Sequence, residues 1–171
     1  IAKGPEGEVE VPFDRLLVAI GRKAITDSLG LDDLGVRKNA NGTLEVDDYL
    51  QTSIPTIYAC GDVVGPYQFT HIASHMAWFA SVNALFGTFR RFRVDYRVVP
   101  WCTYTEPEVA RGGLSEDEAR EQGIEFETSK FEFSGNDRAI AEDDTAGFVK
   151  VLTPPGGSDK ILGVTIVGPH S

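Results

Sequence analysis

The sequence predicts an α/β segment followed by an α+β module built on an antiparallel sheet. Two continuous apolar runs, at residues 16–20 and 57–60, have the length and composition of strands buried on both faces. An apolar stretch with helical character runs from about residue 71 to residue 86. From about residue 95 onward, short strands alternate with turns and one capped helix. An open-sheet portion and a separate antiparallel unit are therefore expected.

Composition excludes several classes of partner. The chain has 171 residues, of which 42% are apolar, enough for one large or two small cores. Its formal charge of -10 argues against nucleic acid and anionic membranes, because both would repel it. Cys60 and Cys102 match no CxxC or metal spacing, which favours a reduced, cytoplasmic setting. The chain shows no signal peptide and no long apolar run, and it begins at Ile1 rather than Met, which suggests part of a longer polypeptide.

The first part of the chain reads as short elements and connectors. Residues 3–10 are expected to form a hairpin that turns at residues 4–7, before the strand at 16–20. A tight turn is expected at residues 39–42. The acidic residues of the connector and the basic run at residues 90–93 are interpreted as solvated surface.

The stretch after the second apolar run carries the candidate site. Gly61 removes the side chain where the expected strand ends, so that another group can approach the backbone. Asp62 follows at the carboxyl end, where open α/β sheets place their ligands. Its acceptor-only carboxylate suits a hydroxyl-bearing ligand such as a ribose or ribityl chain. Thr70 is expected to cap the helix that begins at about His71, whose free N–H groups and positive dipole point back toward Asp62.

Other chemistry-bearing side chains have plainer interpretations. His71 and His75 lie one helical turn apart, a spacing that metal sites also use. Since no HExxH pattern and no third ligand accompanies them, a structural pairing is favoured and no metal site is predicted. Cys60 is interpreted as a small buried hydrophobe. A thiol-redox protein that uses Cys60 and Cys102 is the remaining alternative.

The carboxyl-terminal module is predicted from strands, turns and a capping box. Ser115 and Glu118 have the spacing of a capping box that opens a helix ending at Gly123. Arg111 stands in the strand before it, next to two glycines. The expected strands lie at residues 98–104, 109–114, 124–133, 146–152 and 160–167.

The sequence of residues 56–71 resembles the second flavin-binding segment of the FAD-dependent pyridine nucleotide–disulfide oxidoreductases. This is the family of dihydrolipoamide dehydrogenase, glutathione reductase and mercuric reductase, and the match lies nearer the mercuric-reductase-like branch. Arg111 departs from the apolar residue that the family usually has there, which is expected to weaken its strand. Further matching runs are D-R-L-L-V-A-I-G-R at 14–22, T-E-P-E-V-A at 105–110, G-L-S-E at 113–116, D-R-A at 137–139 and I-L-G-V-T-I-V-G at 161–168.

The resemblance implies a division of the chain and a cofactor site. Residues 1–21 would end an NAD(P)-binding domain, 22–94 would form the second segment of a FAD-binding domain, and 95–171 would form a truncated dimerisation domain. Asp62, after Gly61, would bind the ribityl-phosphate part of FAD. The backbone of Phe69, Thr70 and His71 would face the pyrimidine edge of the isoalloxazine, with His71 a neighbour of the cofactor and not a catalyst.

The activity implied by the resemblance is hydride transfer from NAD(P)H through FAD to a disulfide or similar small-molecule acceptor, in a homodimer with a role in cell redox homeostasis. No G-x-G-x-x-G loop follows a strand here, and the family's redox-active cysteine pair and its His-Glu pair are absent from this chain. His170 is not that histidine. No catalytic residue is therefore predicted. The alternative is that these residues act only as a dimerisation module without catalysis.

Overall fold

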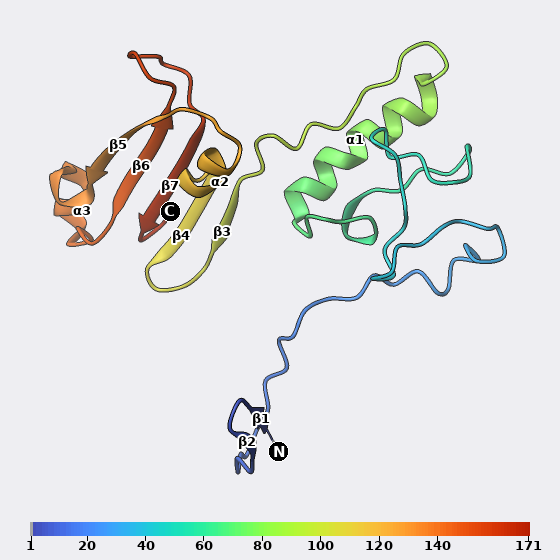
Figure 1. The fold of residues 1–171 in the computed structure, drawn as a ribbon, viewed down its shortest axis with the longest axis horizontal. Helices are drawn as coiled ribbons and strands as arrows, with labels where there is room; N and C mark the ends of the chain where they lie inside the picture. Colours follow the sequence, from blue (N-terminus) through green and yellow to red (C-terminus); the bar gives the residue numbers. More distant parts are fainter. Residues whose placement is uncertain (1) are drawn as a thin grey trace.

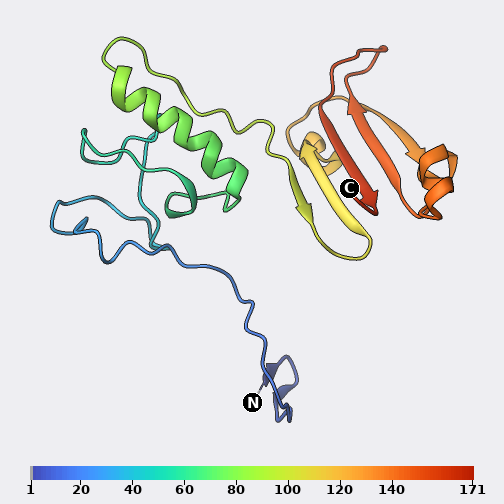
Figure 2. The ribbon, with the colours of Figure 1, turned by 180° about the vertical axis from the view of Figure 1, so that it is seen from behind.

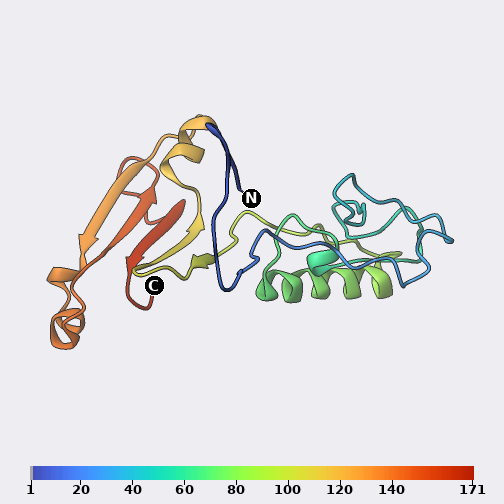
Figure 3. The same ribbon diagram turned by 90° about the horizontal axis from the view of Figure 1, so that it is seen from below.

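The computed structural model describes residues 2–171, which form two units joined by an extended segment (Figure 1). The first unit is built around one long helix, and the second around an antiparallel sheet. The view from below shows the helix of one unit and the sheet of the other side by side (Figure 3). A small hairpin, β1 (Ala2–Gly4) and β2 (Gly7–Val9), lies apart from both units, and its turn is the one that the sequence predicts. Helices together with an antiparallel sheet are thus present, as expected for a mixed chain.

The sheet of the second unit has five strands in the order β3-β4-β7-β6-β5, and every neighbouring pair is antiparallel. All five strands were expected from the sequence. They form because each finds its partner within this part of the chain. Their bounds are β3 (Trp101–Thr103), β4 (Glu108–Gly113), β5 (Glu127–Glu132), β6 (Phe148–Thr153) and β7 (Gly163–Gly168).

The expectation that Arg111 weakens its strand is wrong. All six residues of β4 pair with β7 in unbroken register. The Arg111 guanidinium forms an ion pair with Glu118 and lies 5.8 Å from the centre of the Trp101 ring. The long side chain therefore finds an acid and an aromatic face on its own side of the sheet.

One face of the sheet is covered by α2 (Glu116–Glu121), which begins with the predicted capping box. The Ser115 hydroxyl accepts a hydrogen bond from Glu118 N, and the Glu118 carboxylate accepts one from Ser115 N at 2.9 Å. That backbone N–H lowers the pKa of Glu118. Glu116 forms an ion pair with Lys150 of β6 at 3.1 Å, and Leu152 beneath the helix is fully buried. A third helix, α3 (Asp137–Glu142), was not predicted from the sequence.

The face opposite α2 carries no helix of residues 2–171 (Figure 2). A row of small and apolar side chains crosses four strands of this face. Its members lie opposite one another in the register, and none is charged: Cys102, Ala110, Ile166 and Val149.

The first unit is organised by α1 (Thr70–Phe86). One side of this helix enters a core in which Met76 and Ile72 pack with Leu50. The apolar sequence of this helix suggested burial on all sides. The structure differs, because Trp78 is 55% exposed and Leu85 is 72% exposed. A second small core joins Leu31, Val36, Leu44 and Ala59.

Two predicted buried strands are absent from the described residues. Residues 16–20 have no regular structure, and Leu17 and Ile20 are 89% and 93% exposed. Of residues 57–60, only Tyr58 pairs, in an isolated bridge with Gln51. A buried strand of a parallel sheet needs strand neighbours on both sides. In residues 2–171 no strand lies beside residues 16–20, and residues 57–60 meet only the short segment 50–52. The predicted turn at 39–42, which needs only local contacts, is confirmed by the Gly42 N to Asn39 O hydrogen bond of 2.9 Å.

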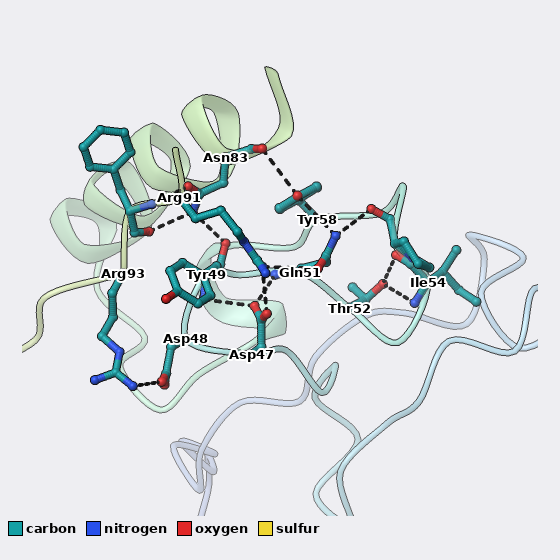
Figure 4. Close-up of polar contacts among 12 residues, drawn as sticks. Asp47, Asp48, Tyr49, Gln51, Thr52, Ile54, Tyr58, Asn83, Arg91 and Arg93 are labelled. Atoms are coloured by element: carbon teal, nitrogen blue, oxygen red, sulfur yellow. Dashed lines mark hydrogen bonds and ion pairs between the residues drawn. The ribbon is translucent and has the colours of Figure 1, made fainter. Parts of the chain in front are cut away.

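A buried asparagine fastens the end of α1 (Figure 4). Asn83 is 1% exposed, and its Nδ2 donates to Tyr49 O at 2.9 Å and to Phe92 O at 2.8 Å. Its Oδ1 accepts from Phe92 N at 2.8 Å. One side chain therefore ties the helix to a loop before it and to the segment after it.

Ion pairs reinforce the same junction (Figure 4). Arg91 Nη2 lies 2.8 Å from Asp47 Oδ2, and its guanidinium stacks over the Tyr49 ring at 4.1 Å. Arg93 pairs with Asp48. These charged side chains lie at the surface, as the sequence predicts, and their pairing also links two segments that lie far apart in sequence.

Candidate functional site

Asp62 lies in a short 3-10 turn, η1 (Gly61–Val63), directly before the loop that leads to α1. Its carboxylate is half exposed, as a ligand-binding group requires. Gly61 turns the chain with a φ of +79°, and a Cβ at that position would lie only 3.2 Å from the Cβ of Ala73 in α1. The missing side chain thus lets the backbone at Asp62 pass close to the first turn of the helix.

The helix begins one residue earlier than predicted. Phe69, with an extended backbone at φ −122° and ψ 139°, is the N-cap, and its side chain makes no capping hydrogen bond. Thr70 is the first helical residue, so its expected capping role is wrong. The Phe69 ring instead stacks on the His71 ring, with centroids 5.5 Å apart. Because no side chain caps the helix, its first-turn N–H groups and positive dipole end remain available to a ligand.

Arg22 reaches this site from a distant part of the chain. Its Nη1 donates to Gln68 O at 3.0 Å and lies 3.7 Å from Asp62 Oδ2. One guanidinium therefore contacts both ends of the loop between η1 and α1. Nothing in the sequence near Arg22 indicates this role, since 46 residues separate it from Gln68.

The two histidines of α1 hold the segment between the units. His71 Nε2 donates to Pro100 O at 2.7 Å, and His75 Nε2 donates to Asp95 O at 3.0 Å. Hydrogen bonds from Arg97 lower the pKa of Asp95 to about 2. Across residues 2–171 no group of three potential ligands is placed to hold a metal ion. The contacts of both imidazoles are structural.

A cavity of about 520 Å³ opens between the start of α1 and the uncovered sheet face. His71 and Pro100 line one side of it. Most of the other lining residues are apolar and come from β3, β4 and β7: Trp101, Cys102, Ala110, Gly112, Val164 and Ile166.

Both cysteines are free. Cys60 packs against the core around Leu50 and Met76, in the apolar role expected for it. Cys102 belongs to the sheet unit, with its Sγ 4.0 Å from Glu108 Oε2. The two thiols serve different units, and this arrangement offers no support for a redox pair.

The predicted site residues thus come together in part. Gly61 and Asp62 lie against α1, and Phe69, Thr70 and His71 form its start. The donor chemistry suits a dinucleotide with a polyol chain, since a carboxylate accepts from hydroxyls and a helix start donates to an electron-rich group.

Comparison with known proteins gives two family matches. Residues 3–77 match the model described as pyridine nucleotide-disulphide oxidoreductase. Residues 99–171 match the model for the dimerisation domain of the same family.

Individual relatives agree with these matches. The chain is 41% identical over 170 residues to the mitochondrial dihydrolipoyl dehydrogenase of Mesocricetus auratus, covering 99% of this chain and 35% of that protein. It is 43% identical over 167 residues to the dihydrolipoyl dehydrogenase of Staphylococcus aureus, covering 98% of this chain and 34% of that protein.

A solved structure has the same fold. The copper(II) complex of the HOCl-induced flavoprotein disulfide reductase RclA from Escherichia coli superposes with a TM-score of 0.80 at 31% identity, over 92% of this chain and 36% of that one. The chain spans about a third of the length of these relatives. Two adjoining matches to one family, with relatives above 40% identity along nearly the whole chain, show that it belongs to the pyridine nucleotide-disulphide oxidoreductase family.

Proposed function

We propose that this chain forms part of a FAD-dependent NAD(P)H oxidoreductase that passes hydride through flavin to a disulfide or similar acceptor. The supporting observation is that the half-exposed Asp62 carboxylate follows directly on Gly61, whose backbone lies against the first turn of the uncapped helix α1. FAD, when bound, supplies the centre that takes electrons from NAD(P)H and passes them to the acceptor. The proposal assigns residues 1–21 to the end of an NAD(P)-binding domain, 22–94 to a FAD-binding domain and 95–171 to a dimerisation domain.

The chain's own residues would bind and orient this cofactor. Asp62 accepts hydrogen bonds from the hydroxyls of the ribityl-phosphate part. The first-turn N–H groups at Phe69, Thr70 and His71 donate toward the pyrimidine edge and favour negative charge there. Gly61 keeps the carboxylate close to that helix end, because any larger residue would meet Ala73. No residue of this chain is assigned a catalytic role.

Substitution Asp62→Asn in the full-length protein is expected to weaken FAD binding roughly 30-fold, because the amide keeps the shape but loses the charge-assisted hydrogen bonds. The measurement is the FAD dissociation constant, obtained by adding FAD to the apoprotein and following flavin fluorescence.

The matched control is Asp33→Asn, which neutralises an exposed aspartate in the turn before Leu34 that forms no ion pair with the residues of η1. It should leave the constant unchanged. If Asp62→Asn binds FAD as tightly as this control, the flavin site does not lie at Asp62 and the proposal fails.

A homodimer through residues 95–171 is the proposed assembly. The dimerisation-domain match and the uncharged row on the open sheet face support it, since an uncharged row spares two chains of charge -10 the repulsion of like charges where they meet. A reducing, cytoplasmic setting is proposed from the two free thiols. None of the helices in residues 2–171 combines the length and the apolar character needed to cross a bilayer.

Substitution Ile166→Glu places a carboxylate in that row and is expected to convert the full-length dimer to a monomer by sedimentation. The control is Ile161→Glu, the same exchange at a residue that is 60% exposed before β7. A mass that is monomeric in both variants and in the parent would refute the dimer, whereas dimeric Ile166→Glu would refute this face as its interface.

A further inference from the structure

Arg22 occupies an unusual place relative to the candidate site. Its Nη1 lies 3.0 Å from Gln68 O and 3.7 Å from Asp62 Oδ2, so it joins the carboxylate to the residue just before the N-cap of α1. At the beginning of the loop between these two points, Val64 N and Gly65 N donate to Gly61 O. At its far end, Tyr67 packs against the core and contacts the Tyr96 ring. Arg22 adds a polar contact that links this far end to Asp62.

We propose that Arg22 is a positioning residue, which sets the distance between the Asp62 carboxylate and the start of α1 so that both bind one dinucleotide. This inference rests on the proposed function, because it concerns the same flavin site. Two groups that hold opposite parts of one ligand must keep a fixed separation, or the binding of one part strains the other. The guanidinium suits this task, since its Nη1 carries two hydrogens and can serve a carbonyl and a carboxylate at once.

The contact is expected to matter in the ligand-bound state more than in folding. The side chains of Arg22 and Asp62 are 66% and 50% exposed, and an ion pair of that kind contributes little to stability in water. A ligand that covers the pair excludes water and strengthens its electrostatic interaction. Loss of Arg22 should therefore weaken the ligand's affinity while the thermal unfolding of the apoprotein stays unchanged.

The alternative is that Arg22 binds a phosphate of the ligand directly and independently of Asp62. A double-mutant cycle separates the two roles. If Arg22 acts through Asp62, removing Arg22 from a protein that already lacks the carboxylate costs nothing further. If it binds the ligand independently, the two losses multiply.

The experiment measures FAD dissociation constants of the full-length apoprotein for Arg22→Gln, Arg22→Lys, Asp62→Asn and the double variant, together with apoprotein melting temperatures. Arg22→Gln is expected to weaken FAD binding roughly tenfold, as is usual when a residue that orients a ligand-binding group is lost. Arg22→Lys should recover only part of this, because lysine keeps the positive charge but its shorter side chain does not place the ammonium where Nη1 lies. The double variant should bind FAD no more weakly than Asp62→Asn alone.

The control is Arg37→Gln, which removes an arginine of matching exposure that pairs with Glu45 outside the site. Its FAD constant should equal that of the parent. An Arg22→Gln constant equal to that control overturns the positioning role, and so does a double variant whose loss is the product of the single losses. If Asp62→Asn weakens FAD binding in either case, the proposed flavin site still holds. If no variant changes the FAD dissociation constant, the proposed function itself is refuted.

Discussion

Substitution Gly163→Ala is expected to destabilise the sheet unit by about 3 kcal/mol, the upper range for a forced overlap in a packed structure. Gly163 lies in the central strand β7, opposite Gly113 of β4. A Cβ there would lie 1.9 Å from Leu114 O and 2.7 Å from Leu114 N, both backbone atoms. Neither can move away without breaking the neighbouring Leu114 N to Leu162 O bond of 3.0 Å.

The measurement is urea unfolding followed by the fluorescence of Trp101, in a background where Trp78 is replaced by Phe so that one indole remains. Gly112→Ala is the matched control in the adjacent strand. The nearest atom to its new Cβ would be 3.9 Å away, so the change should stay within about 0.5 kcal/mol. Equal midpoints for the two variants would show that β4 and β7 do not approach each other in this way.

Substitution Asn83→Ala is expected to destabilise the helical unit by about 3 kcal/mol. The change leaves Tyr49 O, Phe92 O and Phe92 N buried without the amide that bonds them, at about 1 kcal/mol for each lost partner. Because Asn83 is 1% exposed, water cannot replace the missing groups without opening the junction.

Trp78, in the same helix, reports this unfolding when Trp101 is replaced by Phe. The control is Asn136→Ala, which removes an exposed N-cap that accepts from Arg138 N and Ala139 N, at a cost of about 1 kcal/mol to α3. The Trp78 signal should not register that change. An Asn83→Ala midpoint equal to the parent would show that the buried amide is not bonded as described.

The sequence predicted elements whose partners lie within the chain. The five strands of the sheet, the Ser115 capping box and the turn at residues 39–42 all formed, since local chemistry and antiparallel neighbours were present. The strands at 16–20 and 57–60 failed for the opposite reason. An apolar run indicates that a segment can be buried. Whether it is buried depends on the other strands of the sheet, which the run itself does not specify.

The candidate site was singled out from local patterns, and it stays a prediction. Gly61 and Asp62 drew attention because a glycine and an acid after an apolar run have a local signature. The contact of Arg22 with the candidate site and the contacts of Asn83 at the end of α1 were missed, because their partners lie far away in sequence and no local pattern indicates a contact of that kind. Threonine favours the N-cap, which led to the wrong role for Thr70, whereas the extended Phe69 is the N-cap in the structure.

The two histidine contacts of α1 have a consequence for the direction of the linking segment. A carbonyl oxygen only accepts, so each imidazole presents a hydrogen on Nε2 to the segment. The earlier histidine, His71, bonds the later residue, Pro100, and the later histidine, His75, bonds the earlier residue, Asp95. The segment therefore runs antiparallel to the first turns of the helix and is anchored to it at two points.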